Sequence, residues 1–270
     1  MMADFFKDKV VVVTGGTDGI GKALVETLLM QGAKVATCAR NHDKLYRLQS
    51  EFPSYPIHTV LADVSIENDC RHLIESTIKV FGGIDVLINN AGVSMRGLMK
   101  DTEVDVIRRV MEINFYGSVY CTKFALASII ERKGAIVGVS SIAGYRGLPG
   151  RSGYSASKFA LQGWLEALRT ELLDDGVHVM WVCPGFTASN IRNAALNEKG
   201  AAQGESPLNE NKLATPEEVA EDILKAIRKR KRTLVLTFTG KQTVFMNKFF
   251  PALSDKLVKN FFFKNGKLIK

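Results

Sequence analysis

Several features that would place the chain in a specialised class are absent from its 270 residues. The four cysteines form no Cys-x-x-Cys pair, so neither a disulfide framework nor a zinc site is indicated. The first residues lack the basic start, the long apolar run and the cleavage site of a secretion signal. No stretch reaches the roughly 18 apolar residues that a membrane-spanning helix needs. We therefore expect a cytoplasmic protein that binds no metal. Its four thiols should stay reduced, at Cys38, Cys70, Cys121 and Cys183.

Acidic residues are scarce at one end of the chain. The formal net charge is +8, but residues 223–270 contain 13 Lys or Arg and one Asp, whereas the remainder contains 23 Lys or Arg and 27 Asp or Glu. Such asymmetry is typical of a tail that meets an anionic partner, and also of a solvated end. The basic residues carry no nucleic-acid recognition motif, so no nucleic-acid partner is expected.

Short apolar runs alternate with longer segments of helical periodicity. Val- and Ile-rich runs that are buried on both faces are typical of parallel strands joined by helices. The pattern predicts a single Rossmann-type, doubly wound α/β domain over residues 1–240, with a seven-stranded parallel sheet flanked by helices on both faces. A polar flap is expected at 186–214, and a basic, Phe-rich extension at 241–270. The predicted strands are 10–13, 34–38, 57–61, 85–88, 135–139, 177–182 and 234–236, and the main helices are 21–31, 65–81, 104–130 and 155–173.

A glycine-rich turn follows the first predicted strand. Glycines in a strand-to-helix turn let the backbone approach a pyrophosphate, and the helix N-terminus offers unpaired N–H groups. The spacing in TGGTDGIG, residues 14–21, differs from the common G-x-G-x-x-G, and a tight structural turn is the alternative interpretation. The cofactor contacts predicted in this turn are Gly15, Thr17, Asp18, Gly19, Ile20 and Gly21.

The end of the second predicted strand bears on the choice of cofactor. NAD enzymes place an acid there to bond the ribose 2′-hydroxyl. This chain has Arg40 after Ala39, and a guanidinium pairs with a 2′-phosphate that an acid would repel. Arg40 therefore favours NADP(H), and a solvated surface arginine is the alternative. Asp18 departs from this pattern, because many NADP enzymes carry Lys or Arg in the glycine turn.

Three polar residues at predicted strand and helix ends indicate a reaction centre. Tyr154 and Lys158 are four residues apart and share one helix face. An ammonium nearby should lower the tyrosine pKa from about 10 and allow proton exchange at neutral pH. Ser141 follows the strand 135–139, where its hydroxyl can donate to an oxygen that gains charge. Taken singly, a tyrosine is usually part of the core and a lysine is usually solvated. Together, at a strand end and a helix start, the three residues indicate a catalytic group.

This ordered set of motifs resembles the short-chain dehydrogenase/reductase family from about Phe6 to Leu236. The matching residues are TGGTDGIG, Asp63-Val64, Asn89-Asn90-Ala91-Gly92, Asn114, Ser140-Ser141, Tyr154-x-x-x-Lys158 and Pro184-Gly185. Ser189 stands where the family often has Thr.

The resemblance implies further site residues and their roles. Lys158 would also bond the nicotinamide ribose, and Asn114 would hold a water behind it. The family's spacing favours Ser141 over Ser140 as the functional serine. The catalytic group is then Asn114, Ser141, Tyr154 and Lys158. The remaining cofactor contacts are Asp63, Val64, Asn90, Ala91, Gly92, Pro184, Gly185 and Thr187.

Two other classes of function fit less well. A serine hydrolase would need G-x-S-x-G, and the stretch 138–142 lacks the second glycine. A non-catalytic NADP(H)-binding regulatory protein would be expected to lose Tyr154 or Lys158, and both are present.

The tail bears on the substrate. Residues 238–270 hold seven of the 15 phenylalanines, near helical spacing and with lysines between them, and Pro251 interrupts the pattern. This pattern suits peripheral contact with a cytoplasmic membrane face, and equally a tail packed on its own body or on a second subunit. The long tail is similar to that of membrane-associated reductases of lipophilic ketones. A long-chain lipid ketone such as 3-ketosphinganine is the expected substrate, with acyl-dihydroxyacetone phosphate, steroids and small apolar ketones as alternatives. Residues 94–99, residues 145–151 and the flap are expected to build most of the substrate pocket. A homodimer or homotetramer is also expected.

Overall fold

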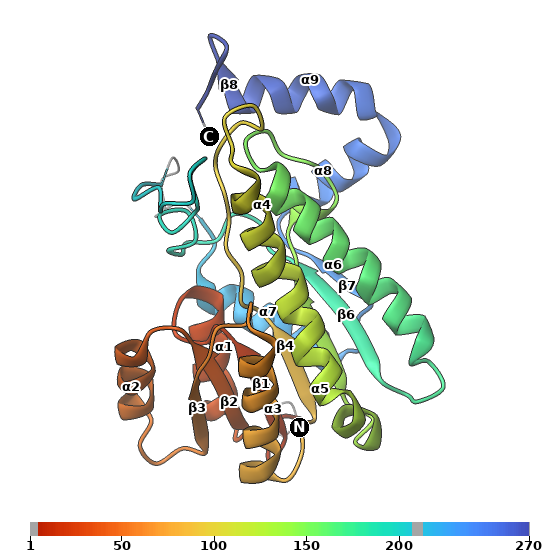
Figure 1. Ribbon diagram of the computed structural model, residues 1–270. Helices are drawn as coiled ribbons and strands as arrows, with labels where there is room; N and C mark the ends of the chain where they lie inside the picture. Colours follow the sequence, from red (N-terminus) through yellow and green to blue (C-terminus); the bar gives the residue numbers. More distant parts are fainter. Residues whose placement is uncertain (1–4, 207–212, 270) are drawn as a thin grey trace.

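The computed structural model describes residues 5–206 and 213–269. Within these ranges, seven parallel strands form one sheet in the order β3-β2-β1-β4-β5-β6-β7 (Figure 1). Each strand lies within one residue of its predicted bounds, so the predicted fold class is confirmed. The strands are β1 (Val10–Thr14), β2 (Lys34–Ala39), β3 (Ile57–Leu61), β4 (Val86–Asn89), β5 (Ala135–Val139), β6 (His178–Cys183) and β7 (Thr233–Val235).

Helices cover both faces of the sheet. Along β1, Val11 and Val13 pack into one buried cluster, and Val10 and Val12 pack into another on the opposite face. The first cluster includes residues of α1 and α7, and the second includes residues of α3, α5 and α6. The helices before the tail are α1 (Gly19–Met30), α2 (His42–Glu51), α3 (Glu67–Phe81), α4 (Val104–Met111), α5 (Gly117–Glu131), α6 (Ser152–Glu171) and α7 (Pro216–Arg228).

The predicted helix 104–130 contains an irregular segment. Between α4 and α5 the backbone forms a π-helical stretch, η1 (Glu112–Tyr116), with Asn114 at its centre. The wider turn accommodates one additional residue without ending the helix. Hydrophobic periodicity identifies the helix, but it does not reveal this local change of pitch.

The flap predicted at 186–214 contains no helix or extended strand in its described residues, which are 186–206, 213 and 214. Isolated bridges join Thr187 to Ala214 and Leu196 to Met95, so the flap is tied to the neighbouring loop. Residues 207–212 of the predicted flap lie outside the described residues.

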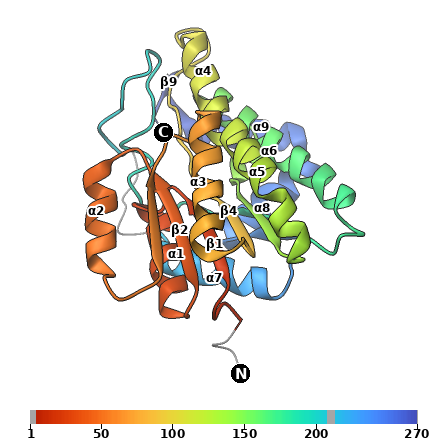
Figure 2. The ribbon, with the colours of Figure 1, turned by 60° about the horizontal axis from the view of Figure 1, so that its bottom comes forward.

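The tail forms two helices and a hairpin beyond the sheet. They are α8 (Phe238–Phe249), α9 (Pro251–Phe262), and the hairpin of β8 (Phe263–Lys264) and β9 (Lys267–Leu268). The predicted break falls at Pro251, which begins α9 as its first residue because proline lacks the N–H needed inside a helix. In the two views the tail lies away from α2, on the side of α6 (Figures 1 and 2). No helix in the described part of the chain is long and apolar enough to cross a membrane.

Candidate active site

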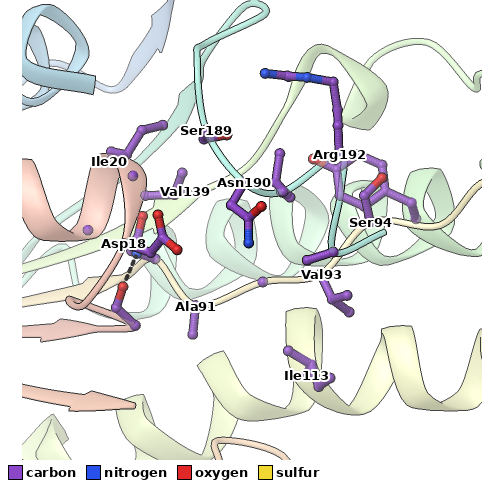
Figure 3. Close-up of a pocket in the computed structure, with 18 of the residues that line it drawn as sticks. Asp18, Ile20, Ala91, Val93, Ser94, Ile113, Val139, Ser189, Asn190 and Arg192 are labelled. Atoms are coloured by element: carbon purple, nitrogen blue, oxygen red, sulfur yellow. Dashed lines mark hydrogen bonds between the residues drawn. The ribbon is translucent and has the colours of Figure 1, made fainter. Parts of the chain in front are cut away.

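One cavity of about 860 Å³ gathers the predicted site residues at the carboxyl ends of the strands. In Figure 3 the flap residues Ser189 and Asn190 face the strand-end residues Ala91 and Val93 across this cavity. Asn114 is the one predicted site residue that does not line it. Those that do are Gly15, Thr17, Asp18, Gly19, Ile20, Gly21, Arg40, Asp63, Val64, Asn90, Ala91, Gly92, Ser141, Tyr154, Lys158, Pro184, Gly185 and Thr187.

The glycine turn has the geometry that close approach of a phosphate requires. Gly15 and Gly19 have φ values of +70° and +49°, a region that side chains disfavour. A Cβ on Gly21 would collide with the Gly15 carbonyl. The Asn90 side chain donates to the carbonyl of Thr14 (2.9 Å) and holds the turn against the end of β4. Asp18 makes no side-chain cap on α1 among the described residues, so the first amide groups of the helix are left for a ligand.

At the far end of the glycine turn the charges are paired. The Lys44 ammonium lies 2.8 Å from the Asp18 carboxylate, and the Arg40 guanidinium lies 3.5 Å from the Asp63 carboxylate. Burial would raise the pKa of Asp63, but hydrogen bonds from Ser65 and the charge of Arg40 outweigh it and lower that pKa. Lys44 also lines the cavity and was not predicted as a site residue.

A sequence signal for Lys44 exists. Asn41 caps α2 by accepting a hydrogen bond from the backbone N–H of Lys44 (2.9 Å). Asn followed by a helical pattern is an N-cap signature, and it places the third helical residue next to the glycine turn.

Tyr154 sits in the first turn of α6, with Ser141 beside it. Ser141 directly follows the loop residue after β5 and caps the short helix η2 (Ile142–Gly144) by accepting from the N–H of Ala143 (3.1 Å). Burial raises the pKa of Tyr154, while a hydrogen bond with Ser141 and the positive charges of Arg151 and Arg192 act against that rise.

Lys158 is buried below Tyr154 and bonded to the end of β5. Its ammonium donates to the Val139 carbonyl (2.8 Å) and lies 5.7 Å from the centre of the Tyr154 ring. The side chain is 4% exposed, and burial lowers the Lys158 pKa to about 8. The pKa of Tyr154 is raised and not lowered as predicted, and the largest opposing charges are those of Arg151 and Arg192. The effect of Lys158 on Tyr154 stays a prediction.

The structure shows that the hydroxyls of Ser140 and Ser141 have different partners. Ser140 is buried and accepts a hydrogen bond from the Gln162 side chain (2.8 Å). Its hydroxyl is thus used inside the protein, whereas Ser141 faces Tyr154.

Asn114 lies behind the cavity wall. Its side chain accepts from the N–H of Val93 (2.8 Å), donates to the carbonyl of Val93 (2.9 Å) and donates to the Ser157 hydroxyl (2.9 Å). It fixes the loop after β4 to α6 next to Lys158, and the relay role assigned to it stays a prediction.

Comparison with known proteins decides the family. A family model described as short chain dehydrogenase matches residues 9–200. The chain belongs to the short-chain dehydrogenase/reductase family. Dehydrogenase/reductase SDR family member 7B of Mus musculus is 37% identical over 262 residues, which cover 94% of this chain and 81% of the mouse protein.

Solved structures of the same family share the fold. A short-chain dehydrogenase from Streptomyces avermitilis superimposes with a TM-score of 0.77 at 27% identity, over 93% of this chain and 96% of its own. A short chain dehydrogenase/reductase from Burkholderia phymatum, solved in complex with NAD, gives a TM-score of 0.82 at 24% identity, over 92% of this chain and 95% of its own. The protein is therefore an oxidoreductase that acts on CH–OH and C=O groups with a nicotinamide cofactor.

The residues that line the substrate end of this short-chain dehydrogenase/reductase are in part different from those predicted. The ranges 94–99 and 145–151 were predicted to build it, but only Ser94, Leu148 and Arg151 of them line the cavity. Met95 is instead fully buried beneath the flap, where it packs with Leu196. The other lining residues toward this end include Val93, Arg109, Ile113, Phe186, Ile191, Arg192, Ala194, Leu196 and Ala202.

Proposed function

We propose that this protein is an NADPH-dependent reductase of ketones. The observation that supports the choice of NADPH is the paired charge at one end of the cavity. Asp18, which would repel a 2′-phosphate, is compensated by Lys44 at 2.8 Å, and Arg40 lines the same region with its side chain 56% exposed. The exposed guanidinium is available to a phosphate, because its contact with Asp63 is 3.5 Å long.

The residues have separate roles in the proposed reaction. The glycine turn and the N-terminus of α1 would hold the pyrophosphate of the cofactor, which supplies the hydride when bound. Ser141 would donate a hydrogen bond to the substrate oxygen, and Tyr154 would give its phenolic proton to the same oxygen as negative charge develops. Lys158, buried below them, would hold the cofactor's ribose.

The proposed substrate class is a long-chain lipid ketone. The apolar residues Leu148, Phe186 and Leu196 line the cavity beyond Tyr154 and suit an alkyl chain. 3-Ketosphinganine is the first substrate to assay. Acyl-dihydroxyacetone phosphate, steroid ketones and small carbonyl compounds are the alternatives.

The experiment is a ketone panel assayed by oxidation of NADPH and of NADH, with and without detergent. We expect turnover of long-chain ketones with NADPH and a much lower kcat/KM with NADH. Absence of turnover with every ketone, or equal efficiency with both cofactors, would contradict the proposal.

We also propose that the tail contacts an anionic membrane surface. Its anchored side packs on the loop after β5: Asn247 donates to the Tyr145 carbonyl (2.8 Å) and Asp255 pairs with Arg146. The apolar residues left exposed are Phe238, Phe245, Phe249, Phe250, Leu253, Leu257, Phe261 and Ile269. Between them lie exposed lysines, at Lys241, Lys248, Lys256, Lys259, Lys264 and Lys267. Exposed phenylalanines among lysines complement an interface of acyl chains and anionic head groups.

A further inference from the structure

A row of polar side chains on one face of α6 is directed at the ends of the central strands. Tyr154, Lys158 and Gln162 follow one another at intervals of four residues, so they share one face of the helix. Gln162 is 7% exposed and, unlike the other two, does not line the cavity. A buried amide costs free energy unless its polar atoms have partners. The proposed reaction gives Gln162 no role, so its partners are informative.

The partners of the Gln162 amide lie where two neighbouring strands end. Its Nε2 donates to the Ser140 hydroxyl (2.8 Å) and, over longer distances of 3.4 Å, to the Ser141 carbonyl and the Cys183 sulfur. Ser140 and Ser141 directly follow β5, and Cys183 is the last residue of β6. One side chain of α6 therefore ties the helix to the segment that carries Ser141.

Lys158 makes the equivalent contact one turn earlier on α6. Its ammonium donates to the carbonyl of Val139, the residue before Ser140 (2.8 Å). The Ser140 hydroxyl in turn lies 3.4 Å from the Lys158 carbonyl oxygen, to which it donates. Val139, Ser140 and Ser141 are thus each hydrogen-bonded to α6. These bonds fix the position of the segment along the helix, residue by residue.

The packing around the Gln162 amide is close. A Cβ on Gly144 would collide with the Gln162 Nε2 and with the Lys158 carbonyl. The Gly144 N–H also donates to the Ser141 carbonyl (2.9 Å), the same oxygen that accepts from Gln162. Glycine at this position lets η2 pack directly on the amide, so a shift of either one is passed on to Ser141.

We propose that Gln162 is a positioning residue for Ser141. This inference rests on the proposed reductase function, in which Ser141 and Tyr154 bond the same substrate oxygen. Their hydroxyls come from two elements, the loop after β5 and the first turn of α6, and they meet only if these elements are correctly aligned. Gln162 holds that alignment at Ser141 itself. A displacement of about 1 Å at a reacting group can lower a rate by about 100-fold, so turnover should report its loss.

The test is a double-mutant cycle between Gln162 and Ser141, measured with NADPH and the best ketone of the panel. Gln162→Met keeps the size of the side chain and removes its hydrogen bonds. We expect kcat to fall by about ten-fold or more, while the dissociation constant of NADPH changes little, because Ser141 acts on the substrate oxygen. In a Ser141→Ala background the same change should lower kcat by less than about two-fold, since no hydroxyl is left to misplace.

The matched control is Gln49→Met. Gln49 is an exposed glutamine on α2 that accepts from the Thr59 hydroxyl (2.9 Å) and does not line the cavity, so kcat should stay unchanged. If Gln162 only stabilises the fold, Gln162→Met lowers the melting temperature and reduces kcat by the same factor in both backgrounds, which would overturn the inference. Should Gln162→Met fail to fold, Ser140→Ala takes its place in the cycle, because it removes the acceptor of the shortest bond.

A crystal structure of Gln162→Met tests the alignment without turnover. We expect the Ser141 hydroxyl to lie farther from the Tyr154 hydroxyl than in the unaltered protein, and an unchanged separation would contradict the inference. If Ser141→Ala alone keeps full kcat, the inference fails together with the role of Ser141, while the reductase function stands. If no ketone is reduced at all, the reductase function fails, and the separation of the two hydroxyls alone decides whether Gln162 positions Ser141.

Discussion

Lys44 and Arg40 stand four residues apart, and each contacts an acid of the cavity wall. Lys44→Gln leaves the Asp18 carboxylate without its counter-charge next to the proposed 2′-phosphate. We expect it to lower kcat/KM for NADPH more than for NADH, and Arg40→Asp to invert the preference. Steady-state kinetics with both cofactors measure the two ratios. Arg47→Gln, an exposed change on the same helix away from the cavity, is the control, and an unchanged ratio in Lys44→Gln would refute the compensation.

Tyr154→Phe removes one hydroxyl and keeps the ring. Turnover should fall by about 10²- to 10⁴-fold, the usual contribution of a general acid. The melting temperature and the dissociation constant of NADPH should change little, because the volume of the side chain is retained. Near-normal turnover in this variant with a good substrate would show that another group supplies the proton.

Lys158 gives the cofactor-free protein a distinctive pH dependence. Its folded-state pKa of about 8 lies below the ordinary 10.5, so the unfolded chain binds more protons between these values. The free energy of unfolding should therefore rise with pH across that window, by on the order of 3 kcal/mol relative to Lys158→Met. Urea unfolding of both proteins at pH 7 and pH 10.5 gives the difference, since other groups titrate alike in the two. Identical pH profiles would mean that the ammonium is not desolvated as described.

At the scale of elements, the tail helices present their apolar side outward. Phe249 and Phe250 are 57% and 50% exposed, and both rings pack against Phe245. The full-length protein should float with vesicles of anionic phospholipid at low salt and float less at high salt, because screening weakens the lysine contribution. The double variant Phe249→Ser/Phe250→Ser should lose most of this binding and keep reductase activity on small ketones.

A control for the tail lies on α2. Tyr46 is 68% exposed on that helix and is remote from the tail, so Tyr46→Ser should leave flotation unchanged. If the full-length protein stays at the bottom of the gradient at low salt, the tail surface serves another purpose. Light scattering then shows whether it joins two copies, and the expected homodimer or homotetramer stays a prediction until that measurement.

At the scale of the whole molecule, the sequence predicted the parts that depend on periodicity. The central strands β1 and β5 are runs rich in Val, Ile and Ala that are buried on both faces, and the sequence shows such runs without any long-range information. The cofactor side of the cavity was predictable for a related reason, since the glycine turn, Asn90 and Tyr154 all follow strand ends or open helices. The family resemblance added roles to these positions.

The parts that sequence did not predict depend on side chains from distant elements. The Asp18–Lys44 pair joins residues 26 apart, and Arg109, Arg151 and Arg192, which come from separate elements, line one cavity only after folding. The low pKa of Lys158 is a consequence of complete burial, which spacing does not reveal. In each case the missing information is the local dielectric environment and the three-dimensional neighbours.

The tail packs against the loop that precedes α6. Phe262 packs beneath Arg151, and a Cβ on Gly150 would collide with Leu268, so the tail directly adjoins the loop that lines the substrate end. A membrane bound by α8 and α9 would lie next to the substrate end of the cavity. A lipid ketone would then enter the cavity without crossing the aqueous phase.

The π-helical stretch at Glu112–Tyr116 holds one residue more than regular α-helical turns would. Upstream, Val106 and Val110 pack with Met95 and Leu196, and downstream Cys121, Ala125 and Ile129 pack against the sheet. Each residue of a helix turns the following side chains by about 100°. Removing a single residue within the stretch would therefore restore regular pitch and leave the buried row of α5 facing the sheet. The frame-preserving loss of one codon from the regular turns of α4 or α5 would instead rotate that row away from the sheet and damage folding more.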